Sequence, residues 1–256
     1  MANGSGSTKL ANKKICIVLP TYNERDNLQR IVPAIQGVLR SHGLAGSATI
    51  LVVDDNSPDG TGHLAEKLAK TYGNVQVLHR RARLGIGSAY RQGFAYAFQK
   101  LDPDIVFQMD ADLSHDPKNL PDFLAKLEEG YDVVVGSRRV PGGKVIGWSL
   151  YRHFLSFVAN QLARRLCGIK VYDATSGYRA FTRRALQKVS YSSIMSEGYV
   201  FQIEMLFKCQ KEGLKIAEVP ITFVGRKIGK TKLSKSEMLN FLFTCLRLLF
   251  RRDTSF

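Results

Sequence analysis

The stretch that decides the fold is Phe107-Gln108-Met109-Asp110-Ala111-Asp112-Leu113-Ser114. An apolar run at residues 105–107 predicts a β-strand, and the chain then breaks at Asp116-Pro117. Alternate residues of a strand face the same side, so we expect Asp110 and Asp112 to point together beyond the strand end. Two carboxylates this close repel unless a cation lies between them. The pair is a candidate metal site, although such a pair by itself is commonly a solvated acidic turn.

Strand and helix patterns alternate before this stretch. Apolar strand segments at residues 15–19, 49–53 and 75–78 are each followed by a segment with helical spacing. The alternation predicts a doubly wound, Rossmann-like α/β sheet, mostly parallel, with helices on both faces. Ligands bind such sheets outside the carboxyl ends of the strands. The polar residues that follow these ends are at positions 20–24, 54–55, 80–87 and 110–112.

The motifs exclude several classes of protein. Gly85-Ile86-Gly87 lacks the third glycine of a dinucleotide-binding fingerprint, and the sequence has no G-x-x-x-x-G-K-[ST] phosphate loop. The four cysteines are widely spaced, which argues against zinc ligands and disulfides. Asp54-Asp55 alone is commonly a strand-end turn. Together with Asp59 and the Asp110/Asp112 pair, it favours a site for a nucleotide and a metal ion.

The net charge of +15 lies entirely in the second half of the 256 residues. Residues 1–137 contain 15 Lys and Arg against 15 Asp and Glu, whereas residues 138–256 contain 22 against 7. This division predicts that one end of the molecule meets a polyanion or an anionic surface. Charge alone leaves nucleic acid and a membrane both open.

A strand and a long helix begin the basic half. The strand at residues 132–135 ends in Gly136-Ser137-Arg138-Arg139, and an amphipathic helix follows at about residues 149–167. Arg152 and Ser156 are four residues apart on this helix, so they share a face.

The ends of the chain differ from its centre. Residues 1–13 predict a disordered N-terminal arm, and residues 14–235 a single α/β domain. Residues 236–256 predict an amphipathic helix that lies in a membrane interface or binds a partner. Its apolar part is about 20 Å long, which is too short to span a bilayer core of about 30 Å. The alternative is an ordinary helix that closes the core of the sheet.

Six motifs together resemble those of one family. They are PTYNE at residues 20–24, DDNSPDGT at 54–61, DADLSH at 110–115, GSR at 136–138, EGYVFQIEM at 197–205 and VPITFV at 219–224. In this order, the set is similar to that of the family-2 glycosyltransferases, in particular the dolichyl- or polyprenyl-phosphate mannose synthases. The resemblance implies a GT-A fold, in agreement with the expected sheet.

The resemblance implies a donor site. Asp110 and Asp112, with Ala111 between them, are expected to hold Mg²⁺ or Mn²⁺ on the diphosphate of a sugar nucleotide. Some relatives have glutamine as a further metal contact where this chain has Ser114. The other implied donor-binding residues are Pro20, Tyr22, Glu24, Val53, Asp55, Arg138, Arg226 and Lys232.

The resemblance also implies an acceptor site. Arg138, Arg152 and Ser156 match positions that grip a lipid phosphate in the family, and Asp112 and Arg138 are the expected catalytic residues. We expect inverting transfer of mannose from GDP-mannose to dolichyl or polyprenyl monophosphate.

The expected partners follow from this reaction. They are GDP-mannose, the lipid phosphate, the membrane surface and a small integral-membrane subunit, with no nucleic acid. We expect a peripheral enzyme on the cytoplasmic face of a membrane, which is the endoplasmic reticulum in a eukaryote or the plasma membrane in a prokaryote.

Three alternatives are open. The donor can be UDP-glucose or another sugar nucleotide, because the residues do not distinguish guanine from uracil. A basic nucleic-acid-binding module would account for the charge, but it predicts aromatic residues within the basic loop, and residues 225–235 contain none. A non-catalytic subunit would require Asp110 and Asp112 to be dispensable.

Overall fold

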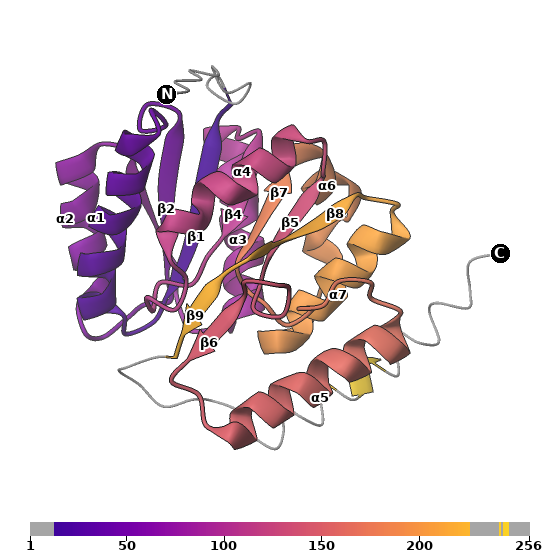
Figure 1. Cartoon of the computed structure of the whole chain (residues 1–256). Coiled ribbons are helices and arrows are strands. Elements are labelled where there is room, and N and C mark those ends of the chain that lie inside the picture. The colour runs from indigo at the N-terminus through magenta and orange to yellow at the C-terminus, as the bar shows by residue number, and fades with distance from the viewer. Residues whose placement is uncertain (1–12, 226–240, 242, 246–256) are drawn as a thin grey trace, which may run out of the picture.

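The computed structural model describes residues 13–225, 241 and 243–245, which are built around a seven-stranded sheet (Figure 1). The strand order is β3-β2-β1-β4-β7-β5-β8. These strands are β1 (Ile15–Thr21), β2 (Ala48–Asp54), β3 (Val75–His79), β4 (Ile105–Gln108), β5 (Val133–Ser137), β7 (Arg179–Thr182) and β8 (Ile216–Pro220). A second sheet, of two parallel strands, consists of β6 (Lys144–Ile146) and β9 (Thr222–Val224).

The large sheet is parallel except at β7, which confirms the expected α/β fold. β1 pairs in parallel with β2 on one side and β4 on the other, so their carboxyl ends lie along one edge. β7 runs antiparallel between β4 and β5 and thereby joins the two halves of the chain. The alternating apolar pattern of residues 216–224 predicts a single strand, but the chain forms two, because it leaves the large sheet after Pro220 and β9 pairs with β6.

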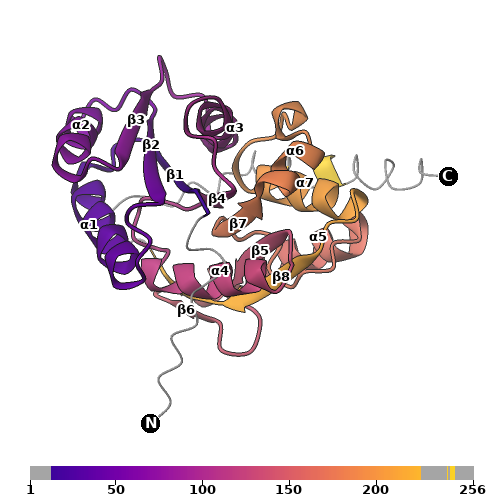
Figure 2. The same cartoon turned by 90° about the horizontal axis from the view of Figure 1, so that it is seen from above.

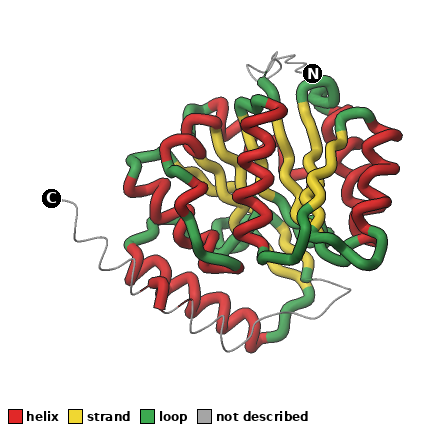
Figure 3. Tube along the Cα trace, turned by 180° about the vertical axis from the view of Figure 1, so that it is seen from behind, coloured by secondary structure: helices red, strands yellow, loops and turns green. Residues whose placement is uncertain are grey.

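Helices cover both faces of the sheet, as Figure 2 shows from above and Figure 3 from behind. One face carries α1 (Arg25–Ser41), α2 (Thr61–Tyr72) and α4 (Leu120–Glu128). The other carries α3 (Ile86–Tyr96), α6 (Arg183–Lys188) and α7 (Gly198–Lys211). The apolar residues of α1 recur at helical spacing and are buried against the sheet, as amphipathic helices require.

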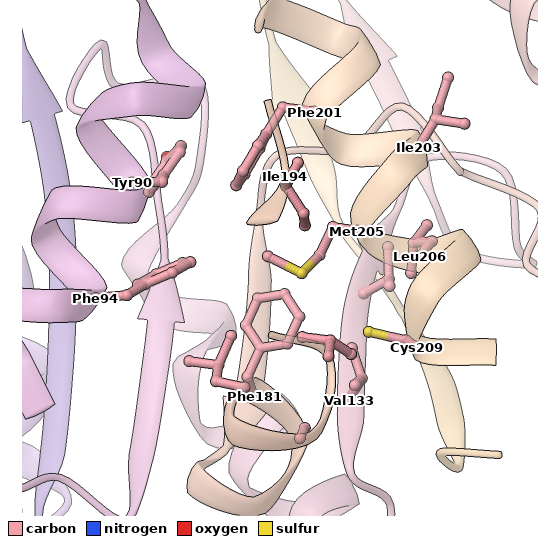
Figure 4. Close-up of a cluster of buried hydrophobic side chains, with 14 of the residues drawn as sticks. Tyr90, Phe94, Val133, Phe181, Ile194, Phe201, Ile203, Met205, Leu206 and Cys209 are labelled. Carbon is pink, nitrogen blue, oxygen red and sulfur yellow. The ribbon is translucent and has the colours of Figure 1, made fainter. Parts of the chain in front are cut away.

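The core on the α3 face ties the two halves together. Tyr90 and Phe94 of α3 face residues from the second half of the chain (Figure 4). The ring centroids of Tyr90 and Phe201 are 6.0 Å apart, and those of Phe94 and Phe181 are 6.2 Å apart. Fully burying one such side chain contributes about 1.5–3 kcal/mol. This packing holds α3 and α7 in place beside the carboxyl ends of the strands.

The helix α5 (Leu150–Cys167) runs along the end of the molecule where β1 finishes (Figure 1). The Ser149 hydroxyl caps it by accepting the N–H of Arg152 at 3.3 Å, and Gly168, with φ 65°, follows its last residue. The helix contains no Asp or Glu. Its first half exposes large side chains: Leu150 is 89% exposed, Tyr151 68%, Phe154 63% and Phe157 50%.

The two chain ends are described only in part. The expected arm at residues 1–13 is described only at Lys13, and most of the expected helix at residues 236–256 lies outside the described residues. Where that helix is described, Cys245 packs in the core near Cys167 of α5. No helix in the described part of the chain is long and apolar enough to cross a bilayer.

Candidate active site

The turn that carries Asp110 and Asp112 follows β4 directly. Leu113 adopts a left-handed φ of 64°, which turns the chain back toward Asp112. The Asp112 carboxylate accepts hydrogen bonds from the N–H of Ser114 at 3.0 Å and from its hydroxyl at 2.5 Å. Ser114 therefore orients Asp112.

Two aromatic side chains hold Asp110. The Tyr90 hydroxyl donates to Oδ1 at 3.1 Å, and Nε2 of His115 lies 4.0 Å from Oδ2. The N–H of Asp110 donates to Nδ1 of His115, so a neutral His115 carries its proton on Nε2. Burial, reinforced by the nearby carboxylates, raises the pKa of Tyr90 well above its ordinary value. Tyr90 is thus a permanent donor to Asp110, whose side chain is 22% exposed.

The carboxylate pair fits a Mg²⁺ or Mn²⁺ ion, because both prefer oxygen ligands. Within the described residues, no group of three or more His, Cys, Asp or Glu side chains could hold a metal ion. The chain offers two carboxylates, which leaves the rest of an octahedral shell to substrate oxygens and water. This donor set suits an ion that binds together with a diphosphate.

A buried ion pair forms at the carboxyl ends of β2 and β3. Nη1 of Arg80 contacts Oδ1 of Asp55, and the two side chains are only 2% and 7% exposed. Arg80 also donates to the Ser88 hydroxyl at 2.6 Å and to Gln92 at 3.1 Å. Burial raises the pKa of Asp55, although Arg80 acts in the opposite direction. The pair ties the loop after β3 to the end of β2.

The other residues predicted to bind the nucleotide differ in their burial and in the groups that they can offer to a ligand. Tyr22 is half-buried, with the guanidinium of Arg83 4.4 Å from its ring centroid. The Glu24 carboxylate accepts a hydrogen bond from within the first turn of α1 at 2.6 Å. Pro20 lies opposite Val53 in the β1–β2 register. The Val53 side chain is buried in the core with α3, so only its backbone can contact a ligand.

Asp173 holds Arg138 at the end of β5. Nε and Nη2 of Arg138 donate to the two carboxylate oxygens at 2.7 and 2.6 Å, and Nη2 also donates to Thr175 at 2.9 Å. The side chains of Arg138 and Asp173 are 7% and 0% exposed. Burial acts to lower the pKa of Arg138 and to raise that of Asp173, but their mutual attraction outweighs burial and reverses both shifts.

Trp148 brings the predicted acceptor residues together. The guanidinium carbons of Arg138 and Arg152 lie 5.3 and 4.3 Å from its ring centroid. Ser156, one turn beyond Arg152 on α5, accepts a hydrogen bond from Nη2 of Arg139 at 2.9 Å. Three arginines and a serine thus gather between the end of β5 and the start of α5.

The loop of residues 173–177 joins the acidic and basic groups. A Cβ added at Gly177 would lie 3.6 Å from Oδ2 of Asp110, so the loop passes close to that carboxylate. At its other end the loop holds Arg138, whose pKa Asp110 also helps to raise. The buried Arg179 fixes the loop by donating to two of its carbonyl groups at 2.9 Å each.

The basic loop predicted to close over the donor begins beside the carboxylate turn. The N–H of Val224 donates to the carbonyl of Ser114 at 3.3 Å. Arg226 follows two residues later, but it and Lys232 lie outside the described residues. Their contacts with donor phosphates stay predictions.

Three residues that build the site were missed from the sequence. The sequence places Tyr90 on the apolar face of a predicted helix, and nothing in its spacing indicates that its hydroxyl reaches Asp110. Asp173 lies in the polar, glycine-containing loop before β7. The sequence shows an acidic residue there but does not indicate that it pairs with Arg138. Arg139 stands beside Arg138, and only the structure shows that the two have different partners.

Comparison with known proteins identifies the family. Residues 16–190 match the family described as Glycosyl transferase family 2. The chain belongs to glycosyl transferase family 2. This glycosyltransferase is 41% identical over 238 residues to the polyprenol monophosphomannose synthase of Mycolicibacterium smegmatis, covering 93% of this chain and 87% of the relative. It is 40% identical over 221 residues to the undecaprenyl-phosphate mannosyltransferase of Micrococcus luteus, covering 86% and 88%. The expected resemblance is confirmed.

Solved structures show the fold of this family-2 glycosyltransferase. A glucosyl-3-phosphoglycerate synthase from Mycobacterium tuberculosis, in complex with Mn²⁺, uridine diphosphate and glucosyl-3-phosphoglycerate, superimposes with a TM-score of 0.66 at 24% identity. The match covers 95% of this chain and 81% of that one. The same synthase with Mn²⁺, UDP-glucose and glycerol 3-phosphate gives a TM-score of 0.65, also at 24% identity and over 95% and 81% of the two chains. The GT-A fold expected from the sequence is confirmed.

Proposed function

We propose that this family-2 glycosyltransferase transfers mannose from GDP-mannose to dolichyl or another polyprenyl monophosphate, with inversion at the anomeric carbon. The observation that carries the proposal is the loop of residues 173–177, which passes beside Asp110 at Gly177 and holds Arg138 at the end of β5 through Asp173. A reaction between two phosphate-bearing substrates needs both the carboxylates and the arginines, because a metal must neutralise one diphosphate and arginines must hold the other phosphate. The names of the two relatives at 40% identity or more support a polyprenyl phosphate and mannose.

The acceptor phosphate is the nucleophile. A phosphate monoester has a second pKa of about 6, so at pH 7 it is mostly a dianion and needs no general base. One of its oxygens forms a bond to C1 of mannose while the bond from C1 to the diphosphate of the donor breaks. GDP departs with that electron pair, and no proton has to move.

The residues of the chain position the reacting charges. Asp110 and Asp112 would hold Mg²⁺ or Mn²⁺, which when bound neutralises charge on the leaving diphosphate. Tyr90 and Ser114 orient the two carboxylates. Arg138 presents a charge that Asp173 keeps fixed in direction, so it needs little reorganisation when substrate binds.

The exposed face of α5 supports a lipid acceptor. Leu150, Tyr151 and Phe154 are exposed near Arg152, on a helix without acidic residues. An apolar face flanked by cations is typical of a helix that lies on an anionic membrane surface. We propose peripheral attachment to the cytoplasmic face of a membrane through α5, in addition to the C-terminal helix that the sequence favoured.

A donor screen tests the proposal. Purified protein is incubated with vesicles that contain polyprenyl monophosphate, with Mg²⁺ or Mn²⁺, and with GDP-mannose or UDP-glucose carrying a labelled sugar. We expect label in the lipid fraction from GDP-mannose. Label from UDP-glucose alone would support transfer to the lipid phosphate but would contradict mannose as the sugar. No label from any sugar nucleotide would overturn the proposed reaction.

A further inference from the structure

We infer that Arg139 is a further ligand of the acceptor phosphate, and that its Nε supplies a donor that has no partner among the described residues. The inference rests on the proposed function, because it assumes that a lipid phosphate binds at the end of β5. The family resemblance assigns that phosphate to Arg138, Arg152 and Ser156, and it gives Arg139 no role.

Arg138 has few donors left for a substrate. Its Nε and Nη2 are committed to Asp173 and Thr175 at 2.6–2.9 Å. Its charge is offset by a carboxylate that is 0% exposed. Turning these nitrogens toward a phosphate would leave Asp173 buried without its partner, which is strongly unfavourable. Arg138 therefore contributes mainly a positive charge in a fixed position, and its bonds to Asp173 also fix the backbone next to Arg139.

Arg139 has a different set of contacts. Its Nη2 donates to Ser156 at 2.9 Å, and its guanidinium carbon lies 5.9 Å from the ring centroid of Phe157. Among the described residues it forms no ion pair with Asp or Glu. Its Nε is buried and has no hydrogen-bond partner in the described part of the chain.

A buried donor without a partner is rare in proteins, because it loses its bonds to water and gains nothing in exchange. An anionic ligand that accepts from Nε of Arg139 would remove this cost. A second buried donor, Nε1 of Trp148, also lacks a partner among the described residues, and its ring lies against Arg138 and Arg152. Two donors without partners thus belong to the cluster that is predicted to receive the acceptor.

The charges around Arg139 also favour an anion. Burial lowers the pKa of Arg139, and Arg138 adds to this effect while Asp173 opposes it. Asp173 is already bound to Arg138, so a dianionic phosphate would be the group that best stabilises the charged form of Arg139.

The position of Arg139 suits a lipid that arrives along α5. Through Ser156 it is joined to the same face of α5 as Arg152, one helical turn away. The exposed side chains of Phe154 and Phe157 lie on the same part of this helix. A phosphate held here would leave its polyprenyl chain next to the apolar face.

The test is steady-state kinetics on the full chain with Arg139→Gln, Arg139→Lys and the matched control Arg184→Gln. Arg184 is a suitable control because its side chain is 72% exposed on α6, which follows the antiparallel β7 and therefore begins at the opposite edge of the sheet. We expect Arg139→Gln to raise the KM for polyprenyl monophosphate about 10-fold or more, as loss of a charged hydrogen bond predicts. The KM for the sugar nucleotide should stay within about twofold of that of the control.

Arg139→Lys separates a phosphate ligand from a structural role. It keeps the charge, so it should recover part of the acceptor KM, whereas a purely structural role would change both KM values and the melting temperature together. An acceptor KM for Arg139→Gln equal to that of Arg184→Gln would overturn the inference, and so would equal effects on both substrates.

A binding measurement distinguishes failure of this inference from failure of the proposed function. Wild-type protein is floated with phosphatidylcholine vesicles that contain polyprenyl monophosphate, and with the same vesicles containing polyprenol. Wild-type binding that does not depend on the phosphate would overturn both. Phosphate-dependent binding that persists unchanged in Arg139→Gln would overturn the role of Arg139 alone.

Discussion

Two buried arginine–aspartate pairs stand at the carboxyl edge of the sheet, one in each half of the chain. In the first half Asp55 contacts Arg80, which also bonds to Ser88 and Gln92. In the second half Asp173 accepts three hydrogen bonds from Arg138, including one from its backbone N–H at 2.9 Å, and a fourth from the Thr175 hydroxyl at 3.3 Å. Burial raises the pKa of Asp55, whereas the attraction of Arg138 lowers that of Asp173.

The two ion pairs have different roles in the two halves of the chain. The pair in the neutral half closes a loop, and the acidic groups that remain nearby, Asp110 and Asp112, suit a cation. The pair in the basic half fixes Arg138 and leaves Arg139 beside it without a carboxylate partner among the described residues. We therefore propose that one half binds a metal-bound diphosphate and the other a phosphate.

The largest expected effect is on the acidic side. Asp112→Asn should lower kcat for mannosyl transfer at least about 10³-fold, because the metal that neutralises the leaving diphosphate loses a charged ligand. The control is Asp122→Asn, a change of the same charge in the first turn of α4. Transfer within tenfold of that control would contradict a metal role for Asp112.

Removal of the buried carboxylate should lower the free energy of unfolding by different amounts in the two ion pairs. Asp173→Ala leaves Arg138 buried without its partner and should lower the free energy of unfolding by about 3–5 kcal/mol. Asp55→Ala should cost less, because Arg80 keeps two side-chain bonds, to Ser88 and Gln92, whereas Arg138 in Asp173→Ala keeps one, to Thr175. Urea unfolding of both variants measures the difference. A larger loss for Asp55→Ala would reverse the comparison.

Tyr90 should affect the metal more than the fold. Tyr90→Phe keeps the buried ring and removes the bond to Asp110. Loss of such an orienting partner typically weakens metal binding about 10–100-fold, so the Mn²⁺ concentration for half-maximal transfer should rise at least tenfold. Metal titrations of activity check this, and an unchanged midpoint would exclude the positioning role.

The two pairs should respond oppositely to pH. The folded pKa of Asp173 is lowered, so its contribution to stability is present above about pH 4 and is lost as the pH falls through the lowered value. The folded pKa of Asp55 is raised, so its contribution is present below about pH 4 and is lost as the pH rises through the raised value. Unfolding of the wild type, Asp173→Asn and Asp55→Asn between pH 3 and 7 measures both trends. Parallel trends would be inconsistent with these assignments.

The smallest expected effect is at the nucleotide end. Arg83→Ala removes the guanidinium that lies over Tyr22. A partly exposed contact of this kind is worth about 0.5–1 kcal/mol, so the KM for the sugar nucleotide should rise about two- to fivefold. The KM for the lipid phosphate should not change. A rise in that KM would contradict the assignment of donor and acceptor to different halves of the chain.

Much of the fold could be predicted because it depends on short-range patterns. The apolar strands at residues 15–19 and 49–53 and the alternation with helices predicted the sheet and the edge at which the site lies. The antiparallel β7 could not be predicted, because its place between β4 and β5 depends on pairing between distant segments. The change of sheet after Pro220 has the same origin.

The candidate site could be predicted only where function leaves a motif. Asp110 and Asp112 could be predicted because two carboxylates this close at a strand end repel each other unless a cation lies between them. The partners of Arg138 and Arg139 were not found, because adjacent arginines look alike in sequence. Only the fold brings Asp173 to one and Ser156 to the other.

The most direct measurement compares two acceptors of the same chain length, polyprenyl monophosphate and unphosphorylated polyprenol. Each is supplied in vesicles with GDP-mannose, labelled in the sugar, and Mn²⁺, and transfer of label to the lipid is followed. If the basic half receives a phosphate that acts as the nucleophile, only the monophosphate will be labelled. Equal labelling of polyprenol would contradict the account.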